Sequence, residues 1–565
     1  MASFEEIQVA DTDEPRREGR PPGVAPALIG LVGVLLVGAA PYLLDAEDCF
    51  EFGKGEAAQG ANAPGEAEVK PTRVCAGDFQ PWVEGDPPPF DGHFNPETVL
   101  PFSQHTKREL TEKAEFDAVA SGTRSKMKLE PIAPRVGLKD GDPTGPANRI
   151  EVRRPPTFKE LAKSIVIPED WYSTCESLDP PRGCVPPATE VDDPGDAMTA
   201  FYRSLAQTAI DSLRGQETGK VTRISHWGDS AIVADGMTSA IRRLMQDSFG
   251  DSGHGFVLID GGKSYAHQDV IHRSKGWHRI PVINRRDKLR RYGFGGISVK
   301  GYGGAWGRFG TVDEGPVGTK VGRFDLYYMS GPGRGTVSLR VDGGPPRLVD
   351  TSSETISDAV YSFKVDDGGH ELVLRAKGAV RLYGVVLERE QPGVVYDSLG
   401  LLGARGSRLL DFDDEHLKAQ FTARDVGLIV LMFGGNELID QTLLKTYRAT
   451  FTAMVKKFRQ ASPPSSCLIM SPVDHAERYR GRFRSVPRLL EIMPVQREVA
   501  HEQGCAYFSN FEAMGGDGSI AAWVKRSPPL AYADYSHLRP AGGELLGLRV
   551  YKALLYGFAQ YLESL

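Results

Sequence analysis

Cysteine and histidine are scarce in this 565-residue sequence, with six and 12 residues respectively, and no two cysteines form a CxxC pair. Zinc folds built on paired cysteines are therefore excluded. The one histidine cluster, formed by His267, His272 and His278, lacks the regular spacing of a metal-binding helix face. The sequence predicts no metal and no cofactor.

An excess of basic charge is also absent. The formal net charge is −7, and no concentrated basic stripe accompanies a nucleic-acid-binding motif. These features exclude nucleic acid as an expected partner. The densest basic run, residues 284–291 (NRRDKLRR), is interpreted as a solvated loop.

Long apolar runs are nearly absent, and the exception is residues 24–44, which carry no charge over 21 positions. This run is long enough to cross a bilayer as a helix. Arginines precede it, whereas the first basic residue after it is Lys54, so residues 1–23 are expected to be a cytoplasmic tail. The sequence predicts a single-pass anchor in the cytoplasmic membrane, with the remaining chain in the periplasm.

The alternative is a signal peptide that is cleaved at a small-residue site, which would give a secreted protein. Both interpretations export the chain to an oxidising compartment, where an even number of cysteines favours disulfides. Local pairings are plausible for Cys49 with Cys75 and for Cys175 with Cys184. Cys467 and Cys505 begin two predicted strands, where buried free thiols are the alternative to a third disulfide.

Residues 45–195 are rich in proline, glycine and charge, with proline runs at 87–89, 180–181 and 186–187. Chains of this composition are mostly extended. We expect an extracytoplasmic spacer here.

Short apolar runs alternate with helical stripes in much of the remaining chain. Strand-like runs occur at residues 221–227, 394–396, 428–433, 467–470 and 505–508. Helical stripes occur at residues 443–458, 486–499 and 543–563. The alternation predicts an α/β domain with a parallel five-stranded sheet, built from residues 196–295 and 391–565.

Residues 296–390 break this pattern with period-two alternation and turn signals such as Asp342-Gly343-Gly344. They predict an antiparallel β-sandwich. Because one crossover helix needs far fewer residues than separate the first two strand-like runs, the sandwich is expected to be an insertion.

Three residues far apart in the sequence have the chemistry of a hydrolytic triad. Ser230 follows the first strand-like run, in the motif HWGDS, while Asp534 and His537 lie near the carboxyl end of the chain. A serine hydroxyl needs an imidazole to accept its proton, and a carboxylate must orient that imidazole. The three-residue spacing of Asp534 and His537 places both on one side of a turn. We predict that Ser230 is the nucleophile.

Two further segments have the donors that an acyl-transfer oxyanion needs. Residues 396–404 contain glycines after a strand, where a backbone N–H is accessible. Residues 433–437 contain Asn436, whose side-chain amide is a second donor.

These residues resemble the SGNH/GDSL hydrolase superfamily, in which Ser, Gly, Asn and His occur in four blocks in this order. The match is Ser230, Gly403, Asn436 and His537, with Gly400 as the competing choice for the second block. The resemblance implies a flavodoxin-like fold. It also implies an oxyanion hole formed by the Ser230 backbone, the Gly403 backbone and the Asn436 side chain.

The inserted sandwich and the run Gly253-His254-Gly255-Phe256 resemble the peptidoglycan O-acetylesterases, in which a carbohydrate-binding-module-like domain separates the first two blocks. Glu437 departs from the Asp of many superfamily members and is not expected to do chemistry. Asp229 and His254 are assigned supporting positions near the triad. The resemblance implies a serine esterase acting on O-acetylated peptidoglycan or another extracytoplasmic polysaccharide.

Three alternatives stay open at this stage. A polysaccharide O-acetyltransferase uses the same acyl-enzyme and differs in its acceptor. A broad lipase or esterase differs in its preference for acyl chain length. A catalytically silent glycan-binding protein would act through the sandwich, although the intact triad argues against it.

Overall fold

The computed structural model describes residues 49–52, 72–75, 125–132, 155–176 and 183–565. The chain divides into two compact units, Met1–Pro87 and Pro88–Leu565. In the first, β1 (Cys49–Phe52) pairs with β2 (Thr72–Cys75) in antiparallel register. The expected anchor at residues 24–44 lies outside the described residues. Within them, no helix has both the length and the apolar character needed to cross a bilayer.

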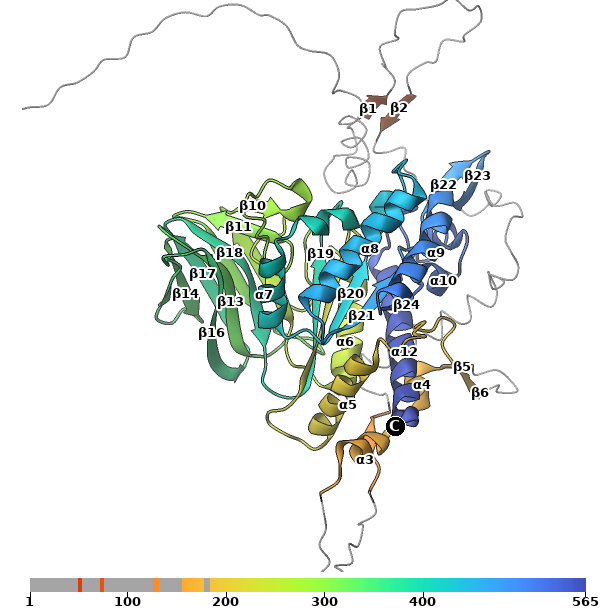
Figure 1. The fold of residues 1–565 in the computed structure, drawn as a ribbon, viewed down its shortest axis with the longest axis horizontal. Helices are drawn as coiled ribbons and strands as arrows, with labels where there is room; N and C mark the ends of the chain where they lie inside the picture. The colour runs from red at the N-terminus through yellow and green to blue at the C-terminus, as the bar shows by residue number, and fades with distance from the viewer. Residues whose placement is uncertain (1–48, 53–71, 76–124, 133–154, 177–182) are drawn as a thin grey trace, which may run out of the picture. The chain divides into compact units, whose positions relative to one another are not determined.

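A parallel five-stranded sheet forms the centre of the second unit (Figure 1). Its strands are, in spatial order, β19 (Gly393–Gly400), β7 (Val221–Gly228), β20 (Leu428–Met432), β21 (Ser466–Met470) and β24 (Ala506–Phe508). The first of these strands along the chain is second in the sheet, which is the flavodoxin-like order. All five predicted strands are confirmed.

Helices cover both faces of this sheet. On one face pack α5 (Thr199–Leu213), α6 (Gly236–Phe249), α10 (Asn510–Met514), α11 (Ser519–Val524) and α12 (Pro540–Ser564). On the other pack α7 (Asp414–Arg424), α8 (Leu444–Ala461) and α9 (Pro487–Glu502). Alternate side chains of β7 supply the two cores, because Ile224 faces the first set of helices and Trp227 the second.

Two antiparallel sheets form the inserted β-sandwich (Figure 1, green). One contains β10 (His278–Pro281), β11 (Ile297–Gly301), β18 (Val380–Glu388), β13 (Val321–Ser330) and β16 (Ser357–Gly368), with β8 (Gly255–Leu258) also paired to β18. The other contains β15 (Arg347–Asp350), β14 (Thr336–Val341), β17 (Glu371–Lys377), β12 (Trp306–Gly310) and β9 (Ile271–Lys275).

The sandwich begins earlier than the expected boundary at residue 296. Strands β8, β9 and β10 all precede that boundary and pair with strands that follow it. The sequence of β9, IHRSK, has no clear apolar alternation. Its structure depends on pairing with β12, a contact between distant residues that local patterning does not reveal.

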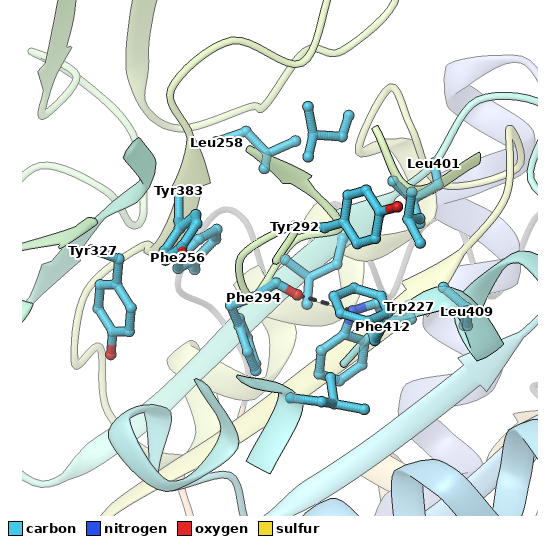
Figure 2. Packing of buried hydrophobic residues seen from close by; sticks show 14 of the residues in the cluster. Trp227, Phe256, Leu258, Tyr292, Phe294, Tyr327, Tyr383, Leu401, Leu409 and Phe412 are labelled. Carbon is cyan, nitrogen blue, oxygen red and sulfur yellow. Dashed lines mark hydrogen bonds between the residues drawn. The ribbon is translucent and has the colours of Figure 1, made fainter. Parts of the chain in front are cut away.

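The sandwich and the parallel sheet share one aromatic core (Figure 2). The Trp227 indole Nε1 donates to the Phe294 carbonyl at 3.2 Å, and the two rings lie 4.8 Å apart. The Phe421 and Phe458 rings lie 5.1 and 5.3 Å from the Trp227 ring. Edge-to-face pairs of this kind contribute about 0.5 to 1.5 kcal/mol each beyond burial. The insertion and the α/β layer are therefore packed around one core.

A buried ionic cluster also joins the two layers. Glu388, at the end of β18, accepts from Arg223 of β7 at 2.9 Å, from Arg323 of β13 at 2.7 Å and from Arg424 of α7. Arg424 in turn makes two parallel hydrogen bonds to Asp397 of β19, at 2.9 and 2.8 Å. The arginines depress the pKa of Glu388 well below its usual range, although burial opposes them.

Cys467 and Cys505 form a disulfide, so of the two alternatives the third disulfide is confirmed and the free thiols are excluded. Cys467 lies in β21 and Cys505 directly precedes β24, and these neighbouring strands bring the Cα atoms to 4.6 Å. The separation of 38 residues concealed this contact in the sequence. Cys49 with Cys75, and Cys175 with Cys184, are register partners in their hairpins, and their disulfides stay predictions.

Part of the expected spacer is folded. The described stretch contains α3 (Phe158–Lys163), α4 (Glu169–Tyr172) and the strand pairs β3 (Lys128–Leu129) with β4 (Ile165–Val166) and β5 (Thr174–Glu176) with β6 (Gly183–Val185). Trp171 is buried, and Lys552 of α12 donates to the Ser173 carbonyl at 2.8 Å. This segment therefore packs against the last helix of the α/β domain.

Candidate active site

The three predicted triad residues lie within hydrogen-bonding distance of one another. Ser230 follows β7, and its Oγ lies 2.9 Å from His537 Nε2. His537 Nδ1 lies 2.8 Å from Asp534 Oδ2. Because the carboxylate accepts the Nδ1 proton, Nε2 is left to accept the proton of the Ser230 hydroxyl. The fold thus brings together groups 307 residues apart in the sequence.

The loop between α11 and α12 holds Asp534 and His537 in this geometry. Asp534 Oδ1 also accepts from the backbone N–H groups of Ser536 and His537, at 3.0 and 3.1 Å. Tyr532 N donates to the His537 carbonyl at 2.9 Å and closes the loop. Since the carboxylate is fixed by three donors, it presents one defined oxygen to the imidazole.

The electrostatic setting favours a basic imidazole. Burial lowers the pKa of His537, but the hydrogen bond and charge of Asp534, together with the charge of Asp229, raise it above its ordinary value. The His537 side chain is 41% exposed, so it is accessible from the solvent side. Burial disfavours the charged form of Asp534, yet its bonds to His537 and to the loop hold the pKa of this carboxyl below its usual range.

Asp229 is buried directly before the serine and acts on His537 through its charge. Its Oδ1 accepts from Ala231 N at 3.1 Å, which shapes the turn that follows Ser230. Burial raises the pKa of Asp229. The supporting role expected for Asp229 stays a prediction.

The two candidate glycines of the second block have opposite surroundings. Gly400 is the last residue of β19, where an added Cβ would lie 2.5 Å from Val233 Cα. Gly403 is exposed with a φ of 71°, and no atom lies within 4 Å of an added Cβ. Among the described residues, its N–H has no hydrogen-bond acceptor. Gly403 therefore has a backbone donor to offer, whereas Gly400 permits close packing.

Asn436 lies in the 3₁₀ turn η4 (Gly435–Glu437), at the carboxyl end of β20. Its Nδ2 donates to the Ala404 carbonyl at 3.0 Å, and its side chain also hydrogen-bonds to the Asp229 carboxylate, which opposes the rise of the Asp229 pKa caused by burial. The bond to Ala404 links the third block to the residue after Gly403. The three proposed oxyanion donors thus lie on adjacent loops at one edge of the sheet.

Glu437 also links the loop that contains Gly403 to the loop that contains Asn436. Its Oε1 accepts from Gly406 N at 2.8 Å, and burial raises the pKa of the carboxyl to about 7. The sequence assigned no chemistry to this position, and the structure gives it a structural contact. Nothing in the local pattern predicted that contact, because Gly406 is 31 residues away.

His254, the other expected supporting residue, is buried and lies 2.9 Å from His267 through Nε2 and Nδ1. Across the described part of the chain, neither ring has a hydrogen bond to the triad. His272 of the same predicted cluster lies within hydrogen-bonding distance of the Ile259 carbonyl. No group of three or more His, Cys, Asp or Glu residues within the described ranges is placed to hold a metal ion.

His475 lies beside the triad loop. Its Nδ1 donates to the Val473 carbonyl at 2.9 Å, and burial lowers the pKa of the ring to about 4. The ring is therefore neutral near pH 7. Together with Asp229 and Gly435 it lines a cavity of about 10 Å³. Only the fold could place it there, since it is 62 residues from His537 in the sequence.

Comparisons with known proteins bear on the fold. No family model matches the chain. No curated protein matches it either. A solved peptidoglycan O-acetylesterase is similar over 66% of this chain and 99% of its own, with a TM-score of 0.55 and 19% identity.

More distant structures cover 51% of the chain. A family two carbohydrate esterase from Clostridium thermocellum, in complex with cellohexaose, has a TM-score of 0.24 at 12% identity and is covered over 100% of its length. A salicylyl-acyltransferase from a tetracycline biosynthetic pathway has a TM-score of 0.25 at 15% identity and is covered over 95%. The chain shares its fold with the peptidoglycan O-acetylesterase, as the sequence resemblance predicted.

Proposed function

We propose that this protein is a serine esterase that removes O-acetyl groups from peptidoglycan or a similar extracytoplasmic polysaccharide. The observation that carries the proposal is the chain of hydrogen bonds from Ser230 through His537 to Asp534, at the carboxyl edge of a parallel sheet. Ligands of open α/β sheets bind at this edge. The shared fold with a peptidoglycan O-acetylesterase supports the choice of substrate class.

In the first half-reaction, His537 Nε2 accepts the proton of Ser230 as Oγ attacks the ester carbonyl carbon. The carbonyl oxygen becomes an oxyanion that the Ser230 N–H, the Gly403 N–H and Asn436 Nδ2 stabilise. Each such donor contributes about 3 kcal/mol to the transition state. The protonated His537 then donates its proton to the sugar oxygen as the ester bond breaks, which leaves an acyl group on Ser230.

In the second half-reaction, His537 accepts a proton from water as the water oxygen attacks the acyl-enzyme. A second oxyanion forms at the same donors. It collapses as His537 returns the proton to Ser230 Oγ, and the acyl group leaves as a carboxylic acid. Asp534 stays ionised throughout and stabilises the imidazolium each time it forms.

The disulfide of the α/β domain supports an exported enzyme. The Cys467–Cys505 disulfide is typical of an oxidising compartment. We place the catalytic domain outside the cytoplasmic membrane, held by an anchor at residues 24–44.

The test is acetate release by the chain from Asp45 onward, with O-acetylated peptidoglycan and a short-chain aryl ester as substrates. We expect release from both, and its loss in Ser230→Ala with an unchanged unfolding transition. Rates that rise with acyl chain length would identify a lipase. Acetyl transfer to glycan oligomers without net release would identify a transferase. Polymer binding without turnover in either protein would contradict an enzymatic function.

A further inference from the structure

A short arginine-rich hairpin lies next to the loop that holds Asp534 and His537, which is called the triad loop. It consists of β22 (Ala476–Tyr479) and β23 (Arg482–Ser485), paired in antiparallel register (Figure 1). Residues 477–484 include four arginines and one glutamate in a chain whose net charge is −7. This hairpin therefore places concentrated positive charge on an otherwise acidic protein.

The base of the hairpin is fixed to the triad loop. Ala476 N donates to the carbonyl of Tyr535, which lies between Asp534 and His537, at 3.0 Å. The Phe483 and Tyr535 rings are stacked with centroids 3.9 Å apart and planes 26° from parallel. The hairpin therefore has a defined position relative to the catalytic residues.

Register decides which side chains share a face with Phe483. Arg478 is its cross-strand partner, so both side chains lie on the face that meets Tyr535. Arg478 is exposed, and its charge acts on the Tyr535 phenol, partly offsetting the burial that raises the pKa of this group. Arg478 thus places a cation on the side of the hairpin that meets the triad loop.

The turn holds a second arginine in an unfavourable backbone conformation. Arg480 has a φ of 50° and Gly481 a φ of 83°, which is the pattern of a two-residue hairpin turn. Asn, Asp or Gly is the usual residue at the first of these positions. Strain at a non-glycine residue is a recurring mark of functional positions. Arg480 lies over the Tyr479 ring at 5.2 Å, so its cation is held near the tip.

Within the described residues, neither Arg478 nor Arg480 forms an ion pair with a carboxylate. The run at residues 284–291 is an exposed loop, as expected, but three of its four arginines bond within the protein. Arg290 donates to three carbonyls of residues 410–412, and Arg291 pairs with Asp358. Most cations of this loop are therefore already engaged.

We propose that the β22–β23 hairpin is a docking arm for carboxylate groups of the glycan substrate, with Arg478 and Arg480 as its main cations. This inference rests on the proposed esterase function and names the substrate class as an anionic O-acetylated glycan. Guanidinium groups bind carboxylates through paired N–H donors. A strand of four residues spans about 13 Å, so the arm contacts polymer beyond the ester that reacts.

The test compares the double variant Arg478→Gln/Arg480→Gln with wild type. The control, Arg375→Gln/Lys377→Gln, removes the same charge from exposed positions of β17 in the sandwich. Three substrates are used: O-acetylated peptidoglycan, neutral O-acetylated xylan and an aryl acetate. We expect kcat/KM on peptidoglycan, divided by that on aryl acetate, to fall about five- to tenfold in the hairpin variant. The same ratio for xylan should not change, and the control should match wild type.

Salt supplies a second readout, because exposed ion pairs are screened. Wild-type activity on peptidoglycan should fall with ionic strength, and more steeply than that of the hairpin variant. Equal losses on peptidoglycan and xylan, or no loss on either, would overturn the proposal. So would reduced binding of the variant to anionic lipid vesicles with unchanged peptidoglycan turnover. A wild type inactive on all three esters would refute the esterase function instead, and peptidoglycan cosedimentation would then test the arm alone.

Discussion

Two regions of this molecule hold a carboxylate against a cationic or protonatable partner, and their surroundings differ. At the triad, the side chains of Asp534 and His537 are 26% and 41% exposed. In the cluster between the sheet and the sandwich, the Glu388 and Asp397 side chains are fully buried, and Arg424 is 2% exposed. The imidazole of the first pair can gain and lose a proton beside solvent, whereas the arginines around Glu388 keep the pKa of that carboxyl well below its usual range.

The difference in burial predicts different roles for the two pairs, because the buried pair stabilises the fold and the exposed pair is free to exchange protons. A buried ion pair is costly to break, because the remaining partner is left charged in a low dielectric. An exposed pair contributes little to stability, yet its imidazole can exchange protons with a substrate. We therefore expect substitutions at the triad to reduce rate without unfolding the protein, and substitutions in the buried cluster to do the reverse.

The largest expected effect is the loss of kcat in the variant Asp534→Asn. The amide cannot accept the Nδ1 proton in the same way, so the imidazole loses the tautomer that activates Ser230. By analogy with serine proteases, kcat should fall about 10⁴-fold. The free energy of unfolding should change by less than about 1 kcal/mol. Steady-state kinetics on an aryl acetate and urea denaturation check both values, and a comparable loss of stability would erase the contrast between the two regions.

The second largest expected effect is a lower free energy of unfolding in the variant Glu388→Gln. Three arginines lose their shared carboxylate, and we expect a loss of about 3 to 5 kcal/mol. Because the pKa of Glu388 is depressed in the folded state, its contribution is present above the unfolded value near 4.5 and disappears as the pH falls below it. Denaturant unfolding at neutral and acidic pH measures this. A cost below about 1 kcal/mol would show that the cluster does not stabilise the junction.

The smallest effect is a shift in the pH profile. His537 must be neutral to accept a proton, and its pKa is raised above the ordinary 6.5. The kcat/KM for an aryl acetate should therefore increase with pH, with an apparent pKa above 6.5. The stabilisation from protonated His537 has the opposite dependence: it is present below 6.5 and is lost as the pH rises through the folded value.

A control variant distinguishes the titration of His537 from that of Glu437, because the pKa of Glu437, about 7, lies in the same pH range. Glu437→Gln keeps an oxygen to accept from Gly406 and cannot titrate. The rising limb should persist in this variant. Its disappearance would assign the limb to the loop contact of Glu437 and contradict the assignment to His537.

The sequence predicted the features that depend on local patterns and on the order of motifs. Apolar runs such as 428–433 identified the five strands, and the motif HWGDS identified the segment that carries Ser230. The spacing of Asp534 and His537 placed them on one turn, as their 2.8 Å contact requires.

Features that depend on contacts between distant segments were missed. Strand β9 has a charged, irregular sequence and is defined by its partner β12. The Cys467–Cys505 disulfide depends on β21 and β24 being neighbours. The ionic cluster joins Glu388 to arginines from 36 to 165 residues away. No local pattern indicates such pairings, because each is made only when the sheets assemble.

The central claim is that Ser230 becomes acylated during turnover. The most direct measurement is mass spectrometry of the peptide containing Ser230 after rapid quenching of the reaction with an aryl acetate. The account predicts one acetyl group on Ser230 that forms within a turnover and disappears once the substrate is exhausted. Its absence during active turnover, or an acetyl group on another residue whose replacement abolishes activity, would contradict the account.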